Sequence, residues 1–79
     1  MRVEVRAFAT VASFLPSPRP STTALLRLPE GSTVRDLTER LGIPTDMSLV
    51  VLVNGTQAGP DRILATDDVV TLFPPLVGG

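Results

Sequence analysis

Apolar and charged residues alternate over residues 2–9, RVEVRAFA, with the period of two that is typical of a strand buried on one face. Residues 24–28, ALLRL, predict a second strand, and the turn-forming residues 29–31, PEG, close it. The first part of the chain therefore predicts two strands joined by a loop.

Two further strands are predicted in the second half of the chain. Residues 49–53, LVVLV, form an apolar run before Asn54-Gly55, which is the strongest short hairpin signal in the chain. Residues 69–73, VVTLF, form the last predicted strand. It ends at Pro74 because proline cannot donate to a strand ladder.

Between these two pairs of strands, residues 32–42, STVRDLTERLG, have apolar residues at the spacing of a helix. Ser32 or Thr33 can cap the helix, Asp36 suits its positive first turn, and Gly42 ends it. Its apolar residues recur at i, i+3 and i+7: Val34, Leu37 and Leu41.

The order of these elements predicts an α+β fold, because one helix across one face of a sheet is the economical way to bury their apolar sides. We expect a ubiquitin-like β-grasp with a mixed four- to five-stranded sheet and one main helix. The proline-rich segment between the first two strands, residues 16–21, is expected to be a loop, with Phe14 and Leu15 folding back onto the body. Its role stays open.

The composition limits what such a domain can do. Its 79 residues and 43% apolar content fit one domain whose core is too small for a deep catalytic cavity. The chain has no Cys, His, Lys, Tyr or Trp, so the usual nucleophiles, bases and zinc ligands are missing, and we expect neither a metal site nor catalysis by the chain alone. A net charge of -1 without a basic cluster argues against a nucleic-acid partner.

The N-terminal residues carry alternating charges in place of a long apolar stretch, so we expect no membrane segment and a cytoplasmic location. The other end of the chain is more informative. Pro74 and Pro75 should detach a flexible tail, residues 74–79, from the β-grasp domain of residues 1–73. Gly78 and Gly79 lack Cβ atoms, so this tail could enter a narrow channel, and it could reach roughly 20 Å.

Five segments together resemble a known family: VEVRAFA, GSTVRDLTERLG, VLVNG, DDVVTLFPP and the final GG. They are similar to the ubiquitin-like sulfur carriers of the MoaD/ThiS type over nearly the whole chain. The Phe-Pro-Pro element resembles the small subunit of molybdopterin synthase more than the thiamin-pathway carrier. That branch usually has a charged stretch containing Arg-Glu-Leu after its first strand, where this chain has its proline-rich loop, so the acceptor enzyme stays open.

This resemblance implies that Gly79 is the reactive residue. An E1-like adenylyltransferase would use ATP to activate its carboxylate, and a sulfur donor such as a cysteine desulfurase or a rhodanese-type protein would convert it to a thiocarboxylate. An acceptor synthase subunit would then take the sulfur, with molybdopterin synthesis as the favoured pathway. The chain itself would bind no cofactor and would act as a protein cosubstrate.

Strand parity predicts a docking surface beside the tail. Phe8 lies on the outward face of the first strand and Phe73 on that of the last. In residues 49–53 either alternating set could point outward, and alignment with a β-grasp places Val50 and Leu52 there. An exposed apolar patch formed by Phe8, Leu52 and Phe73 would mark a partner site. The alternative is that the proline-rich loop covers it.

Two other functions remain open on the sequence alone. A ubiquitin-like modifier would form an isopeptide bond through Gly79, and the missing lysines would then prevent lysine-linked chains of this protein. A non-conjugating interaction domain would not need Gly79 at all.

Overall fold

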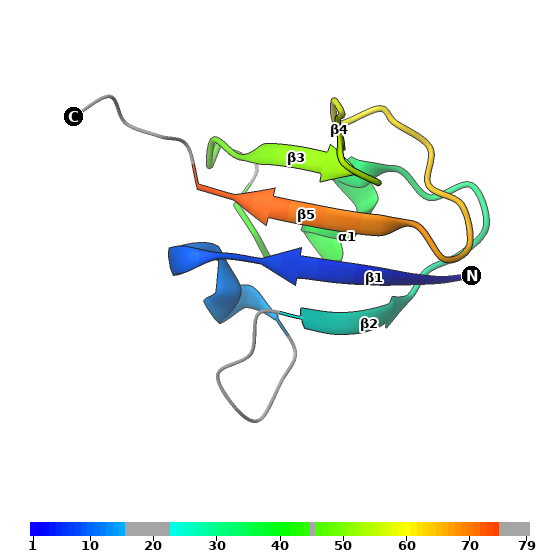
Figure 1. Cartoon of the computed structure of the whole chain (residues 1–79), viewed down its shortest axis with the longest axis horizontal. Helices are drawn as coiled ribbons and strands as arrows, with labels where there is room; N and C mark the ends of the chain where they lie inside the picture. Colours follow the sequence, from blue (N-terminus) through cyan, green and yellow to red (C-terminus); the bar gives the residue numbers. More distant parts are fainter. Residues whose placement is uncertain (16–22, 45, 75–79) are drawn as a thin grey trace.

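The computed structural model describes residues 1–15, 23–44 and 46–74. These residues form a five-stranded sheet with the strand order β2-β1-β5-β3-β4 (Figure 1). The elements are β1 (Arg2–Ala7), η1 (Ala9–Phe14), β2 (Thr23–Arg27), α1 (Val34–Arg40), β3 (Val50–Val53), β4 (Thr56–Gln57) and β5 (Val69–Phe73).

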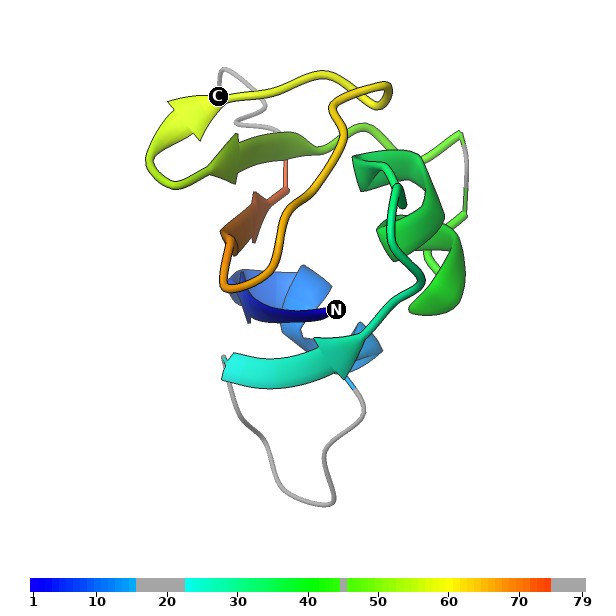
Figure 2. The same ribbon diagram turned by 90° about the vertical axis from the view of Figure 1, so that its right-hand side faces the viewer.

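The sheet is mixed. β1 and β5 pair in parallel at its centre, whereas the β1–β2, β3–β5 and β3–β4 pairs are antiparallel. Helix α1 lies across one face of the sheet, and the other face has no helix over it in the described part of the chain (Figure 2). The predicted β-grasp fold, with its single main helix, is confirmed.

Local signals account for α1 and for the β3–β4 hairpin. Thr33 and Asp36 form a capping box, in which the Asp36 N–H donates to Thr33 Oγ1 at 3.3 Å and the Thr33 N–H donates to Asp36 Oδ2 at 2.9 Å. Asn54 and Gly55 both have positive φ, 52° and 85°, as a type I′ hairpin turn requires. Gly42 ends the helix with a φ of 79°.

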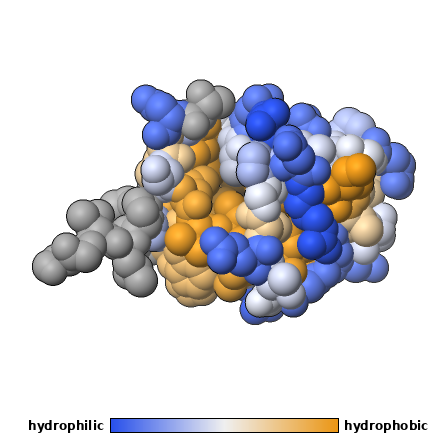
Figure 3. Space-filling model, turned by 90° about the horizontal axis from the view of Figure 1, so that it is seen from above, coloured by the Kyte–Doolittle hydropathy of each residue, from blue (hydrophilic) through white to orange (hydrophobic). Residues whose placement is uncertain are grey.

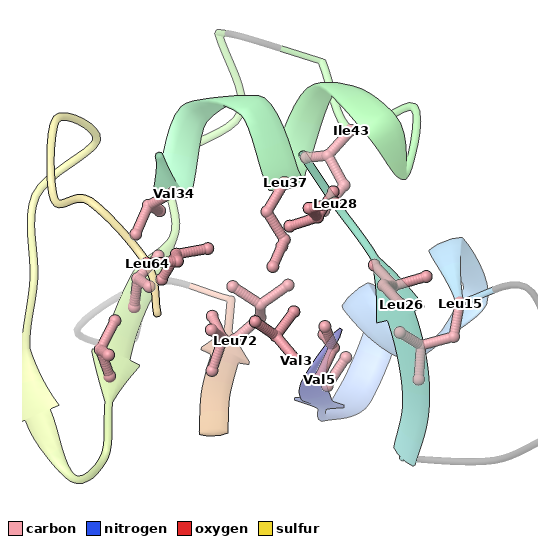
Figure 4. Close-up of a cluster of buried hydrophobic side chains, with 14 of the residues drawn as sticks. Val3, Val5, Leu15, Leu26, Leu28, Val34, Leu37, Ile43, Leu64 and Leu72 are labelled. Atoms are coloured by element: carbon pink, nitrogen blue, oxygen red, sulfur yellow. The ribbon is translucent and has the colours of Figure 1, made fainter. Parts of the chain in front are cut away.

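The core fills the space between α1 and the sheet (Figure 4). Leu37 points from the helix toward the sheet and is fully buried, as is Leu72 on the central strand β5. The strands contribute their inward side chains to this cluster: Val3, Val5, Ala7, Leu26, Val51, Val53 and Val70. Because these residues alternate with exposed or half-buried ones, the opposite face of the sheet stays at the surface.

The segment after β1 differs from the prediction. We predicted a strand to residue 9 followed by an irregular loop, but β1 ends at Ala7 and η1, a 3₁₀ helix, follows it. This helix buries Val11 against the end of β1 and β5, and Leu15 joins the core behind it. The expectation that Phe14 and Leu15 fold back onto the body is confirmed, whereas the proline-rich residues 16–21 lie outside the described ranges.

No helix in the described ranges has the length and apolar character needed to cross a membrane.

Candidate functional site

Two phenylalanines lie side by side where β1 and β5 end. The rings of Phe8 and Phe73 are stacked, with centroids 5.0 Å apart and planes 9° from parallel. The parallel register explains this contact, because Ala7 pairs with Leu72 and the next residue on each strand is a phenylalanine. The Phe8 N–H donates to the Leu72 C=O at 3.1 Å, which extends the strand pairing by one bond.

Val50 completes this cluster from the other side of β5. It lies directly opposite Phe73 in the antiparallel pair of β3 and β5. Phe8 is 39% exposed, and Phe73 and Val50 are half-buried. We call Phe8, Phe73 and Val50 the apolar end of the sheet.

Leu52 was predicted to lie beside Phe8 and Phe73, but in the structure Val50 holds the position next to Phe73. Leu52 shares the outward face but lies opposite Thr71, two residues along β3 from Val50. Parity correctly put Val50 and Leu52 on one face, yet only the register shows which of them adjoins Phe73. The structure therefore brings Phe8 and Phe73 into contact and gives the neighbouring position to Val50.

The surface at this end is largely hydrophobic. Figure 3 looks onto the β3–β4 side of the molecule and shows an orange band toward the left, which is the end where β1 and β5 finish. Blue, hydrophilic side chains adjoin this band toward the middle of the view. A surface of this kind favours contact with another protein over chemistry of its own.

The tail begins beside the apolar end. Pro74 directly follows Phe73, is half-buried and lies outside the strand ladder, as its missing N–H predicts. The other predicted tail residues, Pro75, Gly78 and Gly79, lie outside the described residues. The geometry therefore places only the root of the tail.

The opposite end of the sheet is built from polar contacts. The Asn54 side chain bridges the β3–β4 turn to the start of β5: its Nδ2 donates to Asp68 Oδ1 at 2.9 Å, and its Oδ1 accepts from the Val69 N–H at 2.9 Å. The Ala65 N–H donates to Asp68 Oδ2 at 2.8 Å. We call Asn54, Asp68 and these two backbone partners the polar end of the sheet.

Hydrogen bonding lowers the pKa of one group there. The Ala65 N–H, and after it the Asn54 amide, hold the pKa of the Asp68 carboxyl below its usual range because both stabilise the charged form. Partial desolvation opposes this shift, and the charge of Arg62 adds to it. Every polar atom of the Asp68 side chain is thus engaged in holding the fold, and nothing in its surroundings suggests a reactive carboxylate.

Within the described ranges, no group of three or more acidic side chains is arranged to hold a metal ion.

Comparisons with known proteins agree with this architecture. A family model described as Mut7-C ubiquitin matches residues 1–76. A search of the curated proteins finds no match.

Several solved structures have the same fold over nearly the whole chain. SAMP1 from Haloferax volcanii, a small archaeal modifier protein, is 26% identical with a TM-score of 0.76, and the match covers 100% of both chains. A putative molybdopterin converting factor subunit 1 from Pyrococcus furiosus is 28% identical with a TM-score of 0.74, over 95% of this chain and 98% of that one.

A third structure is a complex of subunits 1 and 2 of the molybdopterin-converting factor from Helicobacter pylori 26695. The matched chain is 21% identical with a TM-score of 0.62 over 100% of both chains, and this likeness concerns the fold. The resemblance to MoaD-type proteins that the sequence predicted is confirmed by these neighbours, and the family match over residues 1–76 shows that the chain belongs to the Mut7-C ubiquitin family of ubiquitin-like β-grasp domains.

Proposed function

We propose that the protein is a sulfur carrier, a non-catalytic cosubstrate that is charged at Gly79. The observation that carries this proposal is the likeness to the P. furiosus subunit, which extends over 95% of this chain and 98% of that one. The position of the tail's root supports it, because Pro74 follows an apolar surface on which a partner could dock while it handles the tail.

The chemistry proposed for Gly79 proceeds in two stages. Within an E1-like enzyme, a carboxylate oxygen attacks the α-phosphorus of ATP and pyrophosphate leaves, which gives an acyl-adenylate. The terminal sulfur of a protein persulfide, carried by a cysteine desulfurase or a rhodanese-type donor, then attacks the carbonyl carbon and AMP leaves. A thiol reductant cleaves the remaining sulfur–sulfur bond and frees the thiocarboxylate.

An acceptor synthase subunit is the proposed destination of the sulfur, with molybdopterin synthesis as the favoured pathway. The H. pylori structure supports a partner of this kind, since it contains a protein of this fold together with a second subunit. Phe8, Phe73 and Leu52, with Val50 added from the structure, are the proposed docking residues for the activating and acceptor enzymes.

Adenylation with a cognate E1-like enzyme and ATP tests the proposal. The full-length chain should form an acyl-adenylate, and a chain lacking Gly79 should form none. Ile63→Ala is a suitable control because Ile63 is 64% exposed and belongs neither to the tail nor to the apolar end. Equal adenylation of the truncated chain would refute the role of Gly79.

A ubiquitin-like modifier is the second candidate, and the likeness to H. volcanii SAMP1 favours it. Both functions would use the same activated glycine, so they differ in the product. A carrier releases its sulfur and regains a free carboxylate, whereas a modifier forms an isopeptide bond with a lysine of its target. Mass spectrometry of trypsin-treated cell extracts would detect such a bond.

A further inference from the structure

Among the residues that the structure describes, strand β2 forms an edge of the sheet and pairs with β1 alone. The Met1 nitrogen donates to the Leu28 C=O and the Leu28 N–H donates to the Met1 C=O, both at 2.8 Å. In an antiparallel pair, such exchanging positions alternate with positions whose backbone groups point away from the partner. Leu25, opposite Glu4, and Arg27, opposite Arg2, are therefore positions that point away from β1.

The bonds of β1 on its other side confirm this alternation. The Glu4 N–H donates to the Asp68 C=O at 2.9 Å, and the Arg2 C=O accepts from the Asp67 N–H at 2.8 Å. Since Arg2 and Glu4 turn their backbone groups toward β5, their partners on β2 turn theirs outward. In the described part of the chain, the N–H and C=O groups of Leu25 and Arg27 have no hydrogen-bond partner.

The side chains of β2 leave this edge accessible. Leu25, at the middle of the strand, is 61% exposed, and Arg27 is exposed as well. Edge strands are commonly protected by charged side chains, proline or a very short length. The other edge strand, β4, has only two residues, whereas β2 has five, contains no proline and carries a single charged residue, Arg27.

The charges beside this edge favour an acidic partner. Arg27 lies directly opposite Arg2, and neither guanidinium has an ion pair within the described residues. Both line a shallow hollow of about 390 Å³ in which Asp67 is the one lining carboxylate facing the two guanidinium groups. Arg6, farther along β1, is paired with Glu4. Like charges at directly opposite positions destabilise a sheet, so an added carboxylate would relieve this pair.

A second copy of this chain fits the edge poorly. An antiparallel β2–β2 contact would bring another Arg27 to the edge, and β2 has no acidic residue to meet it. Charge complementarity therefore selects a partner of different sequence.

We propose that the outer edge of β2 binds an extended, acidic segment of a partner protein as an added antiparallel strand. An aliphatic side chain of that segment lies beside Leu25, and a carboxylate two positions away lies beside Arg27 and Arg2. Main-chain bonds to Leu25 and Arg27 supply the affinity, and the two side chains supply the selectivity. None of the residues that form this surface is assigned to the carrier function, so the proposal can fail while the carrier function stands.

A short capped peptide, Glu-Thr-Ile-Thr-Val, is a suitable probe, with its isoleucine designed to pair with Leu25 and its glutamate with Arg27. N-methylation of the isoleucine removes the amide that faces β2, whereas N-methylation of the preceding threonine alters an amide that faces solvent. In an NMR titration of the full chain, we expect the largest shifts at Leu25 and Arg27. Methylation at isoleucine should weaken binding about tenfold more than methylation at threonine.

Charge variants test the second half of the proposal. Arg27→Glu should weaken binding roughly fivefold or more, whereas Arg35→Glu, the same charge change on α1, should leave it nearly unchanged. Amide spectra of both variants show whether they fold. Equal affinity for the two methylated peptides, shifts centred on Phe8 and Phe73, or no saturable shift at millimolar peptide would each overturn the proposal. Concentration-dependent self-association through β2 without peptide would also overturn it.

Discussion

The two ends of the sheet are built differently although the same strands run through both. At the polar end, Asn54 and Asp68 tie the hairpin turn to the start of β5 through side-chain hydrogen bonds of 2.8 to 2.9 Å. At the apolar end, Phe8 and Phe73 meet through their ring faces alone and remain partly exposed. The polar end thus has its bonding capacity used within the fold, whereas the apolar end retains surface that a partner could bury.

This difference suggests a division of roles between the ends. Satisfied polar contacts fix one arrangement of the strands and leave little for a ligand to gain. Partly exposed aromatic rings contribute only part of their apolar area to folding, and the rest is available for association. We therefore expect substitutions at the apolar end to affect binding more than stability, and substitutions at the polar end to do the reverse.

The largest expected effect is on partner binding at the apolar end. Phe73→Ala should weaken binding to the activating enzyme by about 2 kcal/mol, or roughly thirtyfold, because it removes a large aromatic anchor and the ring against which Phe8 stacks. Its effect on unfolding should be smaller, since Phe73 is only half-buried. Calorimetry with Ile63→Ala as the control measures this, and equal affinity of wild type and Phe73→Ala would remove Phe73 from the docking surface.

A smaller effect, on stability, is expected at the polar end. Asn54→Ala should lower the free energy of unfolding by about 1 to 2 kcal/mol, because it removes two hydrogen bonds and places alanine at a φ of 52°. Asn54→Gly also loses both hydrogen bonds, but glycine adopts a positive φ without strain, so this variant should be less destabilised than Asn54→Ala. Urea unfolding separates the two contributions. If either variant weakened partner binding as much as Phe73→Ala, the division between the ends would be wrong.

The smallest expected effect is on the stability of the protein at acidic pH. Because the folded-state pKa of Asp68 is lowered, its ionised form contributes stability that is fully present at pH values above the ordinary aspartate pKa of 3.8. This contribution is lost as the pH falls from there through the folded-state pKa. Asp68 is only partly buried, so solvent screening keeps the contribution modest. Asp68→Asn should lower the free energy of unfolding at neutral pH, and it should reduce the further loss of stability as the pH falls below about 4. An unchanged dependence of stability on acidic pH would contradict the role given to these bonds.

Sequence reasoning succeeded where local chemistry determines structure. Asn54-Gly55 predicted the hairpin, and a cap at Ser32 or Thr33 with Asp36 in the first turn predicted the helix start, because each signal acts over a few neighbouring residues. Strand parity placed Phe8 and Phe73 on one face for the same reason.

Features that depend on distant partners were not predicted. Val50 adjoins Phe73 only through the β3–β5 register, and the Asn54–Asp68 bond joins residues fourteen positions apart. The 3₁₀ helix η1 lacks a clear apolar period and forms where Val11 and Leu15 find the end of the sheet to cover. The docking role of the apolar end and the chemistry of Gly79 are likewise properties of a complex, which a single chain does not specify.

The most direct test of the sulfur-carrier proposal is the intact mass of the protein isolated from the cells that produce it. We predict a population in which one oxygen is replaced by sulfur, and fragmentation should locate the replacement at Gly79. Treatment with a thiol-specific alkylating reagent should label that population and no other, since the chain has no cysteine. Gly79 found only as a free carboxylate, or only in an isopeptide bond, in cells that make the proposed activating enzyme and sulfur donor would contradict the sulfur-carrier function.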